Sequence, residues 1–415
     1  MIKLFLKKGR EESVLRFHPW IFSGAIAEIK GTPQEGDMVA VYSSIGQFLA
    51  YGHFQIGSIA VRILSYDNDI LLPDFWIRRI AGAYRMRVSL GLAGCPDTDC
   101  YRLVHGEGDM LPGLVIDYYG GVCVMQAHSV GMFRAKSRIA EALKEVYGEN
   151  LKAVYDKSSQ TVPFKAGLDP VDGYLYMKEG FSDKSFTVTE NGHKFYVNWH
   201  EGQKTGFFLD QRENRACVER YAKGKNVLNL FSYTGGFSVY ALAAGANRVV
   251  SVDSSAKAMG LLAKNMELNG FGSHDLKDPE GRHESVCADV DCRHVSVCTD
   301  AMDYLKSAPE HFFDMIIVDP PAFAKHRGAL RNALRAYQRL NASAISKVAP
   351  GGLVFTYSCS QVVDKEAFAL AVFSAAAETG RTVRILDRFN QPADHAVSIY
   401  HPEGEYLKGL LLYVE

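Results

Sequence analysis

Residues 319–323, Asp319-Pro320-Pro321-Ala322-Phe323, combine side chains that can hold a flat polar molecule. The apolar run before them, residues 313–318, is typical of a strand buried on both faces of a parallel sheet. Two prolines cannot continue the backbone ladder, so this strand must end at the acid. Ligands of open α/β sheets bind at the carboxyl ends of the strands. An acid, rigid prolines and an aromatic at that edge therefore predict a pocket for a flat polar group such as a nucleobase.

A cysteine follows the next β-rich run. Residues 353–357 come after the turn Pro350-Gly351-Gly352 and end at Ser358-Cys359-Ser360. In a parallel sheet this edge faces the same crevice as Asp319. A thiolate is a strong nucleophile, so Cys359 is a candidate for covalent chemistry. The alternative is a small buried residue at a strand end, which free cysteines commonly are.

Other predicted strand ends carry residues suited to a nucleotide. Residues 227–231 predict a buried strand, and the turn after it contains Gly235 and Gly236, which allow the backbone to approach a ligand at a helix N-terminus. Asp253 ends the next strand, where an acid can accept hydrogen bonds from ribose hydroxyls. Asp300 ends a third strand and could accept a hydrogen bond from an adenine amino group. Each acid alone could instead cap a helix, but the ordered set is harder to explain in that way.

The turn itself excludes two classes of nucleotide site. It is not Gly-x-Gly-x-x-Gly, because aromatic and hydroxyl residues occupy part of it, and it lacks the lysine of a P-loop. Neither a dinucleotide nor a triphosphate is therefore expected.

The elements that must position these residues follow from the chain's patterns. At 415 residues, two or three domains are expected. Short alternating runs predict a small all-β unit up to about residue 72, and Pro73 opens a mixed α+β unit. Asn191-Gly192 between alternating runs predicts a hairpin. Beyond it, strands near 227–230, 249–252, 295–298, 315–318 and 353–357 alternate with helical stretches, which predicts a doubly wound α/β domain.

The composition limits which partners the protein can attract by charge and where in the cell we expect it. A hydrophobic content of 47% is that of an ordinary globular protein, and a net charge of −1 gives no global attraction to nucleic acid. Contacts with nucleic acid would need local basic patches. No segment predicts a membrane span or an export signal, and the eight scattered cysteines are expected to be reduced thiols. A cytoplasmic location is expected.

The polar stretch from Phe271 to Arg293 interrupts the α/β rhythm. It brings Cys287, Cys292 and His294 near Cys298 in the sequence, so a zinc site is conceivable. No Cys-x-x-Cys pair is present, and a surface loop without metal is the favoured interpretation.

The ordered strand ends resemble those of class I S-adenosylmethionine-dependent methyltransferases. More closely, the chain is similar to the bacterial large-subunit ribosomal RNA cytosine-5 methyltransferase family with an N-terminal PUA domain, the RlmI-like family. The resemblance covers essentially the whole length, although the stretch from Phe271 to Arg293 departs from the family pattern. The motifs that carry it are Gln203-Lys204-Thr205-Gly206-Phe207-Phe208-Leu209-Asp210-Gln211-Arg212, Asn229-Leu230-Phe231-Ser232-Tyr233-Thr234-Gly235-Gly236-Phe237, Asp319-Pro320-Pro321-Ala322-Phe323, Ser358-Cys359-Ser360 and Pro402-Glu403-Gly404-Glu405-Tyr406-Leu407-Lys408-Gly409.

The resemblance implies an α/β fold class with a Rossmann-like class I methyltransferase domain at the C-terminal end. It implies a β-rich PUA-like RNA-binding domain over residues 1–72, a central α+β domain over 73–184, a hairpin linker over 185–199 and the methyltransferase domain over 200–415. The implied cofactor is S-adenosylmethionine, with S-adenosylhomocysteine as its product. The residues expected to bind it are Phe207, Asp210, Arg212, Asn229, Phe231, Tyr233, Thr234, Gly235, Gly236, Asp253, Asp300 and Asp319.

The resemblance also implies a reaction on large-subunit ribosomal RNA. Carbon 5 of cytosine is a poor nucleophile, so its methylation calls for a temporary bond from Cys359 to carbon 6. Asp319 is expected to hydrogen-bond the base and stabilise charge as the adduct forms. The base must be splayed or flipped out of the RNA, and Phe323, beside Pro320 and Pro321, is placed to stack on it. A core role for Phe323 is an equal alternative.

A basic series follows the proline motif. Arg327, Arg331, Arg335 and Arg339 recur every fourth residue, with Lys325 before them. On a helix this spacing makes one basic stripe, which we expect to contact RNA phosphates. An ordinary solvated helix face is the alternative.

Two rival functions remain open at this point. Asp-Pro-Pro-Phe-like strand ends also occur in methyltransferases that act on exocyclic amines, which need no thiol. A ribosome-assembly RNA-binding protein that keeps the fold without catalysis is a rival of another class. The sequence does not determine the oligomeric state, and a homodimer is retained as one alternative.

Overall fold

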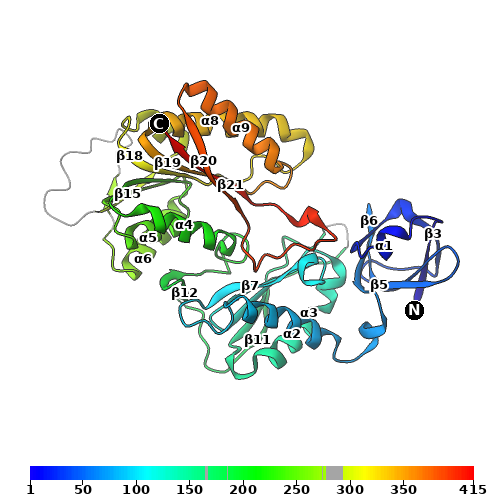
Figure 1. Cartoon of the computed structure of the whole chain (residues 1–415). Helices are drawn as coiled ribbons and strands as arrows, with labels where there is room; N and C mark the ends of the chain where they lie inside the picture. Colours follow the sequence, from blue (N-terminus) through cyan, green and yellow to red (C-terminus); the bar gives the residue numbers. More distant parts are fainter. Residues whose placement is uncertain (164–166, 185, 273, 277–292) are drawn as a thin grey trace. The chain divides into compact units, whose positions relative to one another are not determined.

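The chain divides into two compact units, each built from several stretches of sequence. The computed structural model describes residues 1–163, 167–184, 186–272, 274–276 and 293–415 (Figure 1). The first unit consists of Met1–Glu190, Val197–Leu209 and Ala393–Gly404, and the second consists of Asn191–Tyr196, Asp210–Pro392 and Glu405–Glu415. The polypeptide therefore passes repeatedly from one unit to the other.

The first unit begins with a six-stranded sheet of order β2-β6-β5-β4-β1-β3, as the alternating runs predicted. Its buried core includes Leu4, Leu6, Val39, Val61 and Ile63. The elements of this part are β1 (Ile2–Leu6), α1 (Glu12–Leu15), β2 (Trp20–Phe22), β3 (Ile26–Lys30), β4 (Met38–Tyr42), β5 (Phe48–Phe54) and β6 (Ile59–Ser65).

A five-stranded sheet of order β11-β10-β9-β8-β7 makes up the rest of the first unit, and the helices α2 and α3 pack against it. The helices are amphipathic, and their apolar faces meet the buried side chains of the sheet. The elements are α2 (Phe75–Ser89), β7 (Cys100–His105), β8 (Leu114–Tyr119), β9 (Val122–Ala127), α3 (Val130–Tyr147), β10 (Ala153–Asp156), β11 (Gly173–Met177) and β12 (Thr187–Glu190).

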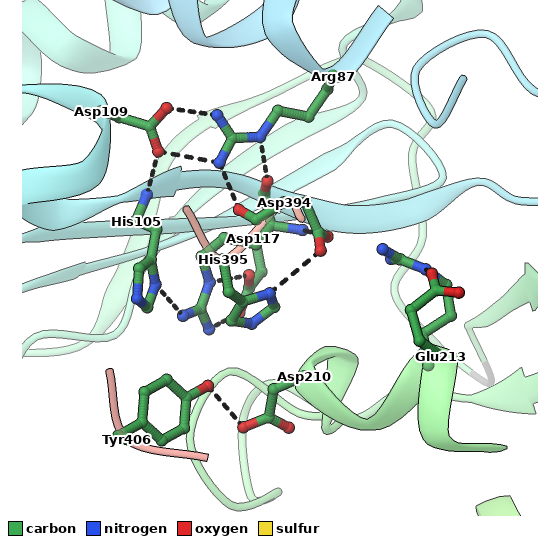
Figure 2. A network of polar contacts seen from close by, with 11 residues as sticks. Arg87, His105, Asp109, Asp117, Asp210, Glu213, Asp394, His395 and Tyr406 are labelled. Atoms are coloured by element: carbon green, nitrogen blue, oxygen red, sulfur yellow. Dashed lines mark hydrogen bonds and ion pairs between the residues drawn. The ribbon is translucent and has the colours of Figure 1, made fainter. Parts of the chain in front are cut away.

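A buried network of charges crosses this unit (Figure 2). The Arg87 guanidinium forms a double ion pair with the Asp109 carboxylate and donates to the Asp394 carbonyl oxygen at 2.5 Å. The Arg102 guanidinium forms a second double pair with Asp117, at 2.6 and 3.0 Å. These side chains are almost fully buried. Bidentate geometry is what allows such charges to leave water, because each donor keeps an acceptor.

The same network holds two distant segments of the chain. The Asp394 carboxylate accepts a hydrogen bond from the Arg102 backbone N–H at 2.9 Å, and the Thr205 hydroxyl donates to Asp117 at 2.5 Å. The Thr205 hydroxyl is also bonded to the Tyr119 hydroxyl. These bonds fix residues 393–404 and 197–209 to the five-stranded sheet of the first unit.

The second unit contains an eight-stranded sheet of order β16-β17-β15-β14-β18-β19-β21-β20. The strands from β16 to β19 are parallel, and β21 runs antiparallel to both β19 and β20. The doubly wound α/β fold that the sequence predicted is confirmed. Strand order reverses direction at β14, between β15 and β18, and such switch points are where open α/β sheets bind ligands at their carboxyl edge.

Helices cover both faces of this sheet (Figure 1). Buried side chains of α7, α8 and α9 join those of β18 and β19 in one core cluster. The elements are β13 (His193–Tyr196), α4 (Arg212–Ala222), β14 (Asn226–Leu230), α5 (Gly236–Ala243), β15 (Arg248–Asp253), α6 (Ala256–Leu268), β16 (His274–Leu276), β17 (His294–Cys298), α7 (Ala301–Ser307), β18 (Phe313–Val318), α8 (Leu330–Lys347), β19 (Val348–Ser358), α9 (Lys365–Thr379), β20 (Val383–Asn390) and β21 (Lys408–Val414).

The predicted strands on either side of Asn191-Gly192 are present as β12 and β13. Asn191 has φ +49° and Gly192 has φ +83°, the left-handed pair that a tight hairpin turn requires. Among the helices within the described ranges, none is long and apolar enough to cross a membrane.

Breaking the buried Arg102–Asp117 pair should destabilise the first unit. In Asp117→Asn the buried Arg102 guanidinium loses its double ion pair, so we expect the free energy of unfolding to fall by about 3–5 kcal/mol. Chemical denaturation followed by circular dichroism would measure the loss. Asp74→Asn is the matched control, because it removes an exposed partner of Arg78 in the same unit and should cost about 1 kcal/mol or less. Equal losses in the two variants would contradict the prediction.

Candidate active site at the carboxyl edge of the large sheet

Asp319 follows the last residue of β18 and is half-buried. Its carboxylate accepts a hydrogen bond from the Gln211 side-chain amide at 3.0 Å. Gln211 is itself buried, and its amide oxygen accepts a bond from the Asn214 side chain on α4. The Asp319 carboxylate is thus held in a defined orientation by a chain of side-chain amides.

Cys359 follows the last residue of β19 and is also half-buried. On either side of it the neighbouring serines are fully buried and bonded: the Ser358 hydroxyl donates to the Tyr337 hydroxyl at 2.9 Å, and the Ser360 hydroxyl donates to the Ala324 carbonyl at 2.8 Å. The thiol is therefore fixed by its neighbours at the same sheet edge as Asp319.

Tyr337 on α8 lies beside both candidates. Burial raises the pKa of the Tyr337 phenol to about 12, and the nearby charges of Cys359 and Asp319 add to this rise. The phenol therefore stays protonated near neutral pH. The Tyr337 ring also packs against Phe323, with ring centroids 4.7 Å apart, and Phe323 remains half-buried.

The turn after β14 has a strained backbone. Phe231 and Tyr233 have φ of +57° and +46°, in the left-handed region that such bulky residues rarely adopt, and Gly235 has φ +81°. The turn is pinned by bonds from the Ser232 N–H to the Val252 carbonyl and from the Asn265 amide to the Thr234 carbonyl. Strain of about 1–3 kcal/mol per residue persists only where surrounding contacts impose it, and it is concentrated at functional sites.

Gly235 is required by packing and by its left-handed backbone, and Gly236 is closely packed. A Cβ atom on Gly235 would lie 2.9 Å from Leu262 Cγ, and one on Gly236 would lie 3.1 Å from Arg215 Cδ. Side chains of the protein itself thus occupy the space next to both glycines, so each glycine allows helix packing around the turn.

Asp253 links the turn to the neighbouring strand. Its carboxylate accepts hydrogen bonds from the backbone N–H groups of Tyr233 and Ser255, both at 2.9 Å. Asp300 is exposed and caps α7, where one carboxylate oxygen accepts bonds from the N–H groups of Met302 and Asp303. The capping role considered as an alternative for Asp300 is therefore present.

The remaining predicted cofactor residues are mostly buried. Asn229 is fully buried in β14 and donates to the Ser238 hydroxyl at 2.8 Å. Asp210 accepts a bond from the Tyr406 hydroxyl at 2.7 Å, which Figure 2 shows. Arg212 begins α4 and pairs with Glu213. Phe207 belongs to the first unit, where it is buried and its carbonyl oxygen is 3.4 Å from the Tyr119 hydroxyl.

The predicted basic stripe is only partly helical. Arg331, Arg335 and Arg339 lie on α8, whereas Arg327 lies in a short 3-10 turn before it. Arg327 therefore lies just outside the helix that carries the other three arginines, and Gly328, a poor helix former, lies between. All four arginines are at least partly exposed, and within the described ranges none of them has a hydrogen-bond or ion-pair partner.

Comparisons with known proteins bear on this arrangement. A family model described as a PUA-like domain matches residues 4–66, and one described as S-adenosylmethionine-dependent methyltransferase matches residues 170–399. The chain is 38% identical over 415 residues to ribosomal RNA large subunit methyltransferase I of Aeromonas salmonicida, covering 99% of this chain and 98% of that protein. It is 39% identical to the protein of the same name from Photobacterium profundum, covering 99% of each.

The chain belongs to the S-adenosylmethionine-dependent methyltransferase family. A solved structure agrees: SMU.776, a methyltransferase complexed with SAH, superposes with a TM-score of 0.81 at 25% identity, covering 100% of both chains. The class I methyltransferase fold expected from the sequence and the cofactor S-adenosylmethionine are both confirmed.

The carboxylates of Asp253 and Asp300 have free hydrogen-bond acceptors that suit the ribose and the adenine of this cofactor. A carboxylate can accept about four hydrogen bonds, and backbone N–H groups occupy two of these positions on Asp253. The remaining capacity matches the two hydroxyls of a ribose. Asp300 keeps one carboxylate oxygen free of the capping bonds, so it can accept from an adenine amino group.

Sequence reasoning missed several residues of the methyltransferase site. Gln211 and Lys408 fall inside the motifs quoted above, but neither was given a role. Tyr337 was not singled out at all. The available signal for Lys408 was its position at the start of an otherwise apolar strand, Lys408–Val414.

Of the conceivable zinc ligands, Cys287 and Cys292 lie outside the described residues.

Asp253 should contribute to cofactor affinity. In Asp253→Asn one oxygen can still accept the Tyr233 N–H, but the charge and half of the acceptor capacity are lost. We expect the affinity for S-adenosylhomocysteine to fall about tenfold to hundredfold, the equivalent of a hydrogen bond to a charged group. Isothermal titration calorimetry measures the change. Asp303→Asn, which removes an exposed partner of Lys306 on the neighbouring helix, should leave the affinity unchanged; an equal loss in both variants would refute the assignment.

Proposed function

We propose that this methyltransferase transfers a methyl group to carbon 5 of a cytosine in large-subunit ribosomal RNA, through a temporary covalent bond from Cys359. The names of the relatives support the RNA substrate, since both are ribosomal RNA large subunit methyltransferase I. The match of residues 4–66 to a PUA-like domain supports an RNA-binding function for the first sheet.

The observation that carries the choice of carbon 5 is the half-buried thiol of Cys359 one strand from Asp319. Methylation of an amine needs no thiol, because nitrogen already has an electron pair to donate. Methylation of carbon 5 needs a nucleophile at carbon 6. The presence of Cys359 on the strand next to that of Asp319 therefore favours methylation of carbon 5.

The reaction can be followed through the protein's own groups. The Cys359 thiolate forms a bond from Sγ to carbon 6, and the electrons of the 5,6 double bond move toward carbon 5 and the ring carbonyl. Asp319, held by Gln211, hydrogen-bonds the base edge, and a proton shared between its carboxyl group and ring nitrogen 3, which is conjugated with carbon 5, neutralises the negative charge that builds up there. Bound S-adenosylmethionine supplies an electrophilic methyl group. Once carbon 5 carries the methyl, a base takes its proton, and the electron pair of that C–H bond restores the 5,6 double bond and expels the Cys359 thiolate.

The substrate-binding residues extend from the sheet edge onto α8. Pro321 is exposed and Phe323 is half-buried on Tyr337, which suits a base stacked at the end of β18. Lys325, Arg327, Arg331 and Arg335 lead away from that point and have no acid partner among the described residues. Unpaired cations of this kind are suited to phosphates. The homodimer, the cytoplasmic location and the four-domain division of the chain stay predictions.

Replacement of the nucleophile separates carbon methylation from amine methylation. Cys359→Ala should abolish methyl transfer to large-subunit ribosomal RNA, because the proposed bond from Cys359 to carbon 6 cannot form, while the affinity for S-adenosylhomocysteine is retained. Tritium transfer from labelled cofactor, with mass spectrometry of the modified nucleoside, measures both turnover and product.

The matched control for this variant is Cys298→Ala, since Cys298 is an exposed cysteine at the end of the parallel strand β17. It should retain full turnover. Undiminished turnover in Cys359→Ala would refute the covalent mechanism and favour an amine methyltransferase. Absence of any cofactor binding or turnover in the wild type would favour the non-catalytic assembly protein.

The basic stripe on α8 should contribute to RNA affinity. Replacing Arg331 and Arg335 with Gln removes two phosphate contacts, so the slope of log affinity against log salt should flatten by about 1.4 to 1.8. Filter binding to ribosomal RNA fragments over a salt series measures the slope. A double replacement of Arg384 and Arg388, exposed on β20, removes the same charge and is the control. The same slope in the wild type and the α8 variant would rule out the contact.

A further inference from the structure

Lys408 is a buried cation beside the candidate nucleophile. Its side chain is only 5% exposed, and Nζ donates to the backbone carbonyl oxygens of Ser360 and Val363, at 2.5 and 2.6 Å. No carboxylate lies within ion-pair distance of it in the part of the chain that the structure describes. A buried charge is costly unless its surroundings compensate for it, so this position calls for an explanation.

Strand pairing brings Lys408 to the thiol. Lys408 begins β21 and lies directly opposite Ser358 in the antiparallel pair of β19 and β21. Cys359 is the next residue after Ser358, and the carbonyl groups that bind Nζ belong to the loop that follows Cys359. The ammonium group is therefore enclosed by the backbone that carries the thiol.

The electrostatic surroundings of Lys408 and Cys359 are described by the groups that shift the pKa of the lysine. Burial lowers the pKa of Lys408 to about 8, and this shift is opposed first by Cys359 and then by Asp364 and Glu405, while Lys365 adds to it. Asp319 lies nearby, since Cys359 and Asp319 both act on the Tyr337 phenol. Below pH 8 the lysine carries its proton, and Cys359 is the ionisable group that interacts with it most strongly.

We propose that Lys408 is a positioning residue that stabilises the thiolate form of Cys359. A fixed positive charge favours the ionised state of a neighbouring thiol, and only the thiolate attacks carbon. Two of the three ammonium protons are directed to carbonyl groups, which fixes the cation and leaves the third available for the sulfur. This inference rests on the proposed function, in which Cys359 is the nucleophile.

The thiol's ionisation can be measured without RNA or turnover. Iodoacetamide alkylates only the thiolate, so the rate at Cys359, followed by peptide mass spectrometry, should rise with a midpoint below the value of about 8.5 of a free cysteine. Lys408→Met should raise this midpoint by about one pH unit and slow alkylation at neutral pH about threefold to tenfold, since the more basic thiolate is partly compensated by higher nucleophilicity.

Lys365→Met is the matched control. Lys365 is exposed and pairs with Glu405 at 2.8 Å, and its replacement removes the same charge from the same neighbourhood. The alkylation midpoint of this variant should equal that of the wild type. Retained binding of S-adenosylhomocysteine shows that Lys408→Met is folded.

Two results would overturn the inference. One is an unchanged midpoint in a Lys408→Met protein that binds S-adenosylhomocysteine. The other is an alkylation midpoint of wild-type Cys359 at or above the free-cysteine value of about 8.5. This second result would exclude stabilisation of the thiolate even where Lys408→Met does not fold. Either result leaves the covalent mechanism standing if Cys359→Ala is inactive, whereas an active Cys359→Ala removes the nucleophile whatever Lys408 does.

Discussion

Parallel pairing of β18 with β19 is the constraint on which the site depends. The register aligns Val318 with Thr356, so both strands leave the sheet at the same edge. Asp319 follows at once, while β19 continues to Ser358 because β21 pairs with its last residues. The antiparallel strand thus carries Cys359 a short distance beyond Asp319, at about 3.3 Å per residue. It also brings Lys408 to the same point, so one strand both extends the proposed nucleophile and supplies the cation proposed to stabilise its thiolate.

The site combines rigid support with local strain. Left-handed φ values at Phe231 and Tyr233 each cost about 1–3 kcal/mol, more than a typical hydrogen bond contributes. The bond from the Tyr233 N–H to Asp253 offsets part of this cost and fixes the acid at the same time. A relaxed turn would be more stable, so the retained strain agrees with a turn that is shaped for a ligand.

The sequence was informative where a single segment determines its own structure. The run ending at Asp319 identified a buried strand and its end because apolar residues and two prolines leave little choice. The sequence was silent where a side chain depends on a distant partner: Gln211 meets Asp319, and Lys408 meets the carbonyl groups after Cys359, only once the sheet has formed. The arginine spacing also did not reveal where α8 begins, since it continues through Gly328 although α8 starts at Leu330.

Two segments of the chain lead from the buried charges of the first unit into the second unit. Asp117 holds Thr205, and the same stretch of chain continues within a few residues to Asp210 and to Gln211, which orients Asp319. Arg87 and Arg102 likewise hold Asp394, whose segment continues to Tyr406. The Tyr406 hydroxyl then donates to the Asp210 carboxylate, so the two anchored segments meet each other again in the second unit. Within the second unit the bond from Tyr406 to Asp210 and the bond from Gln211 to Asp319 involve neighbouring residues, so the Tyr406 segment helps to fix the orientation of the Asp319 carboxylate.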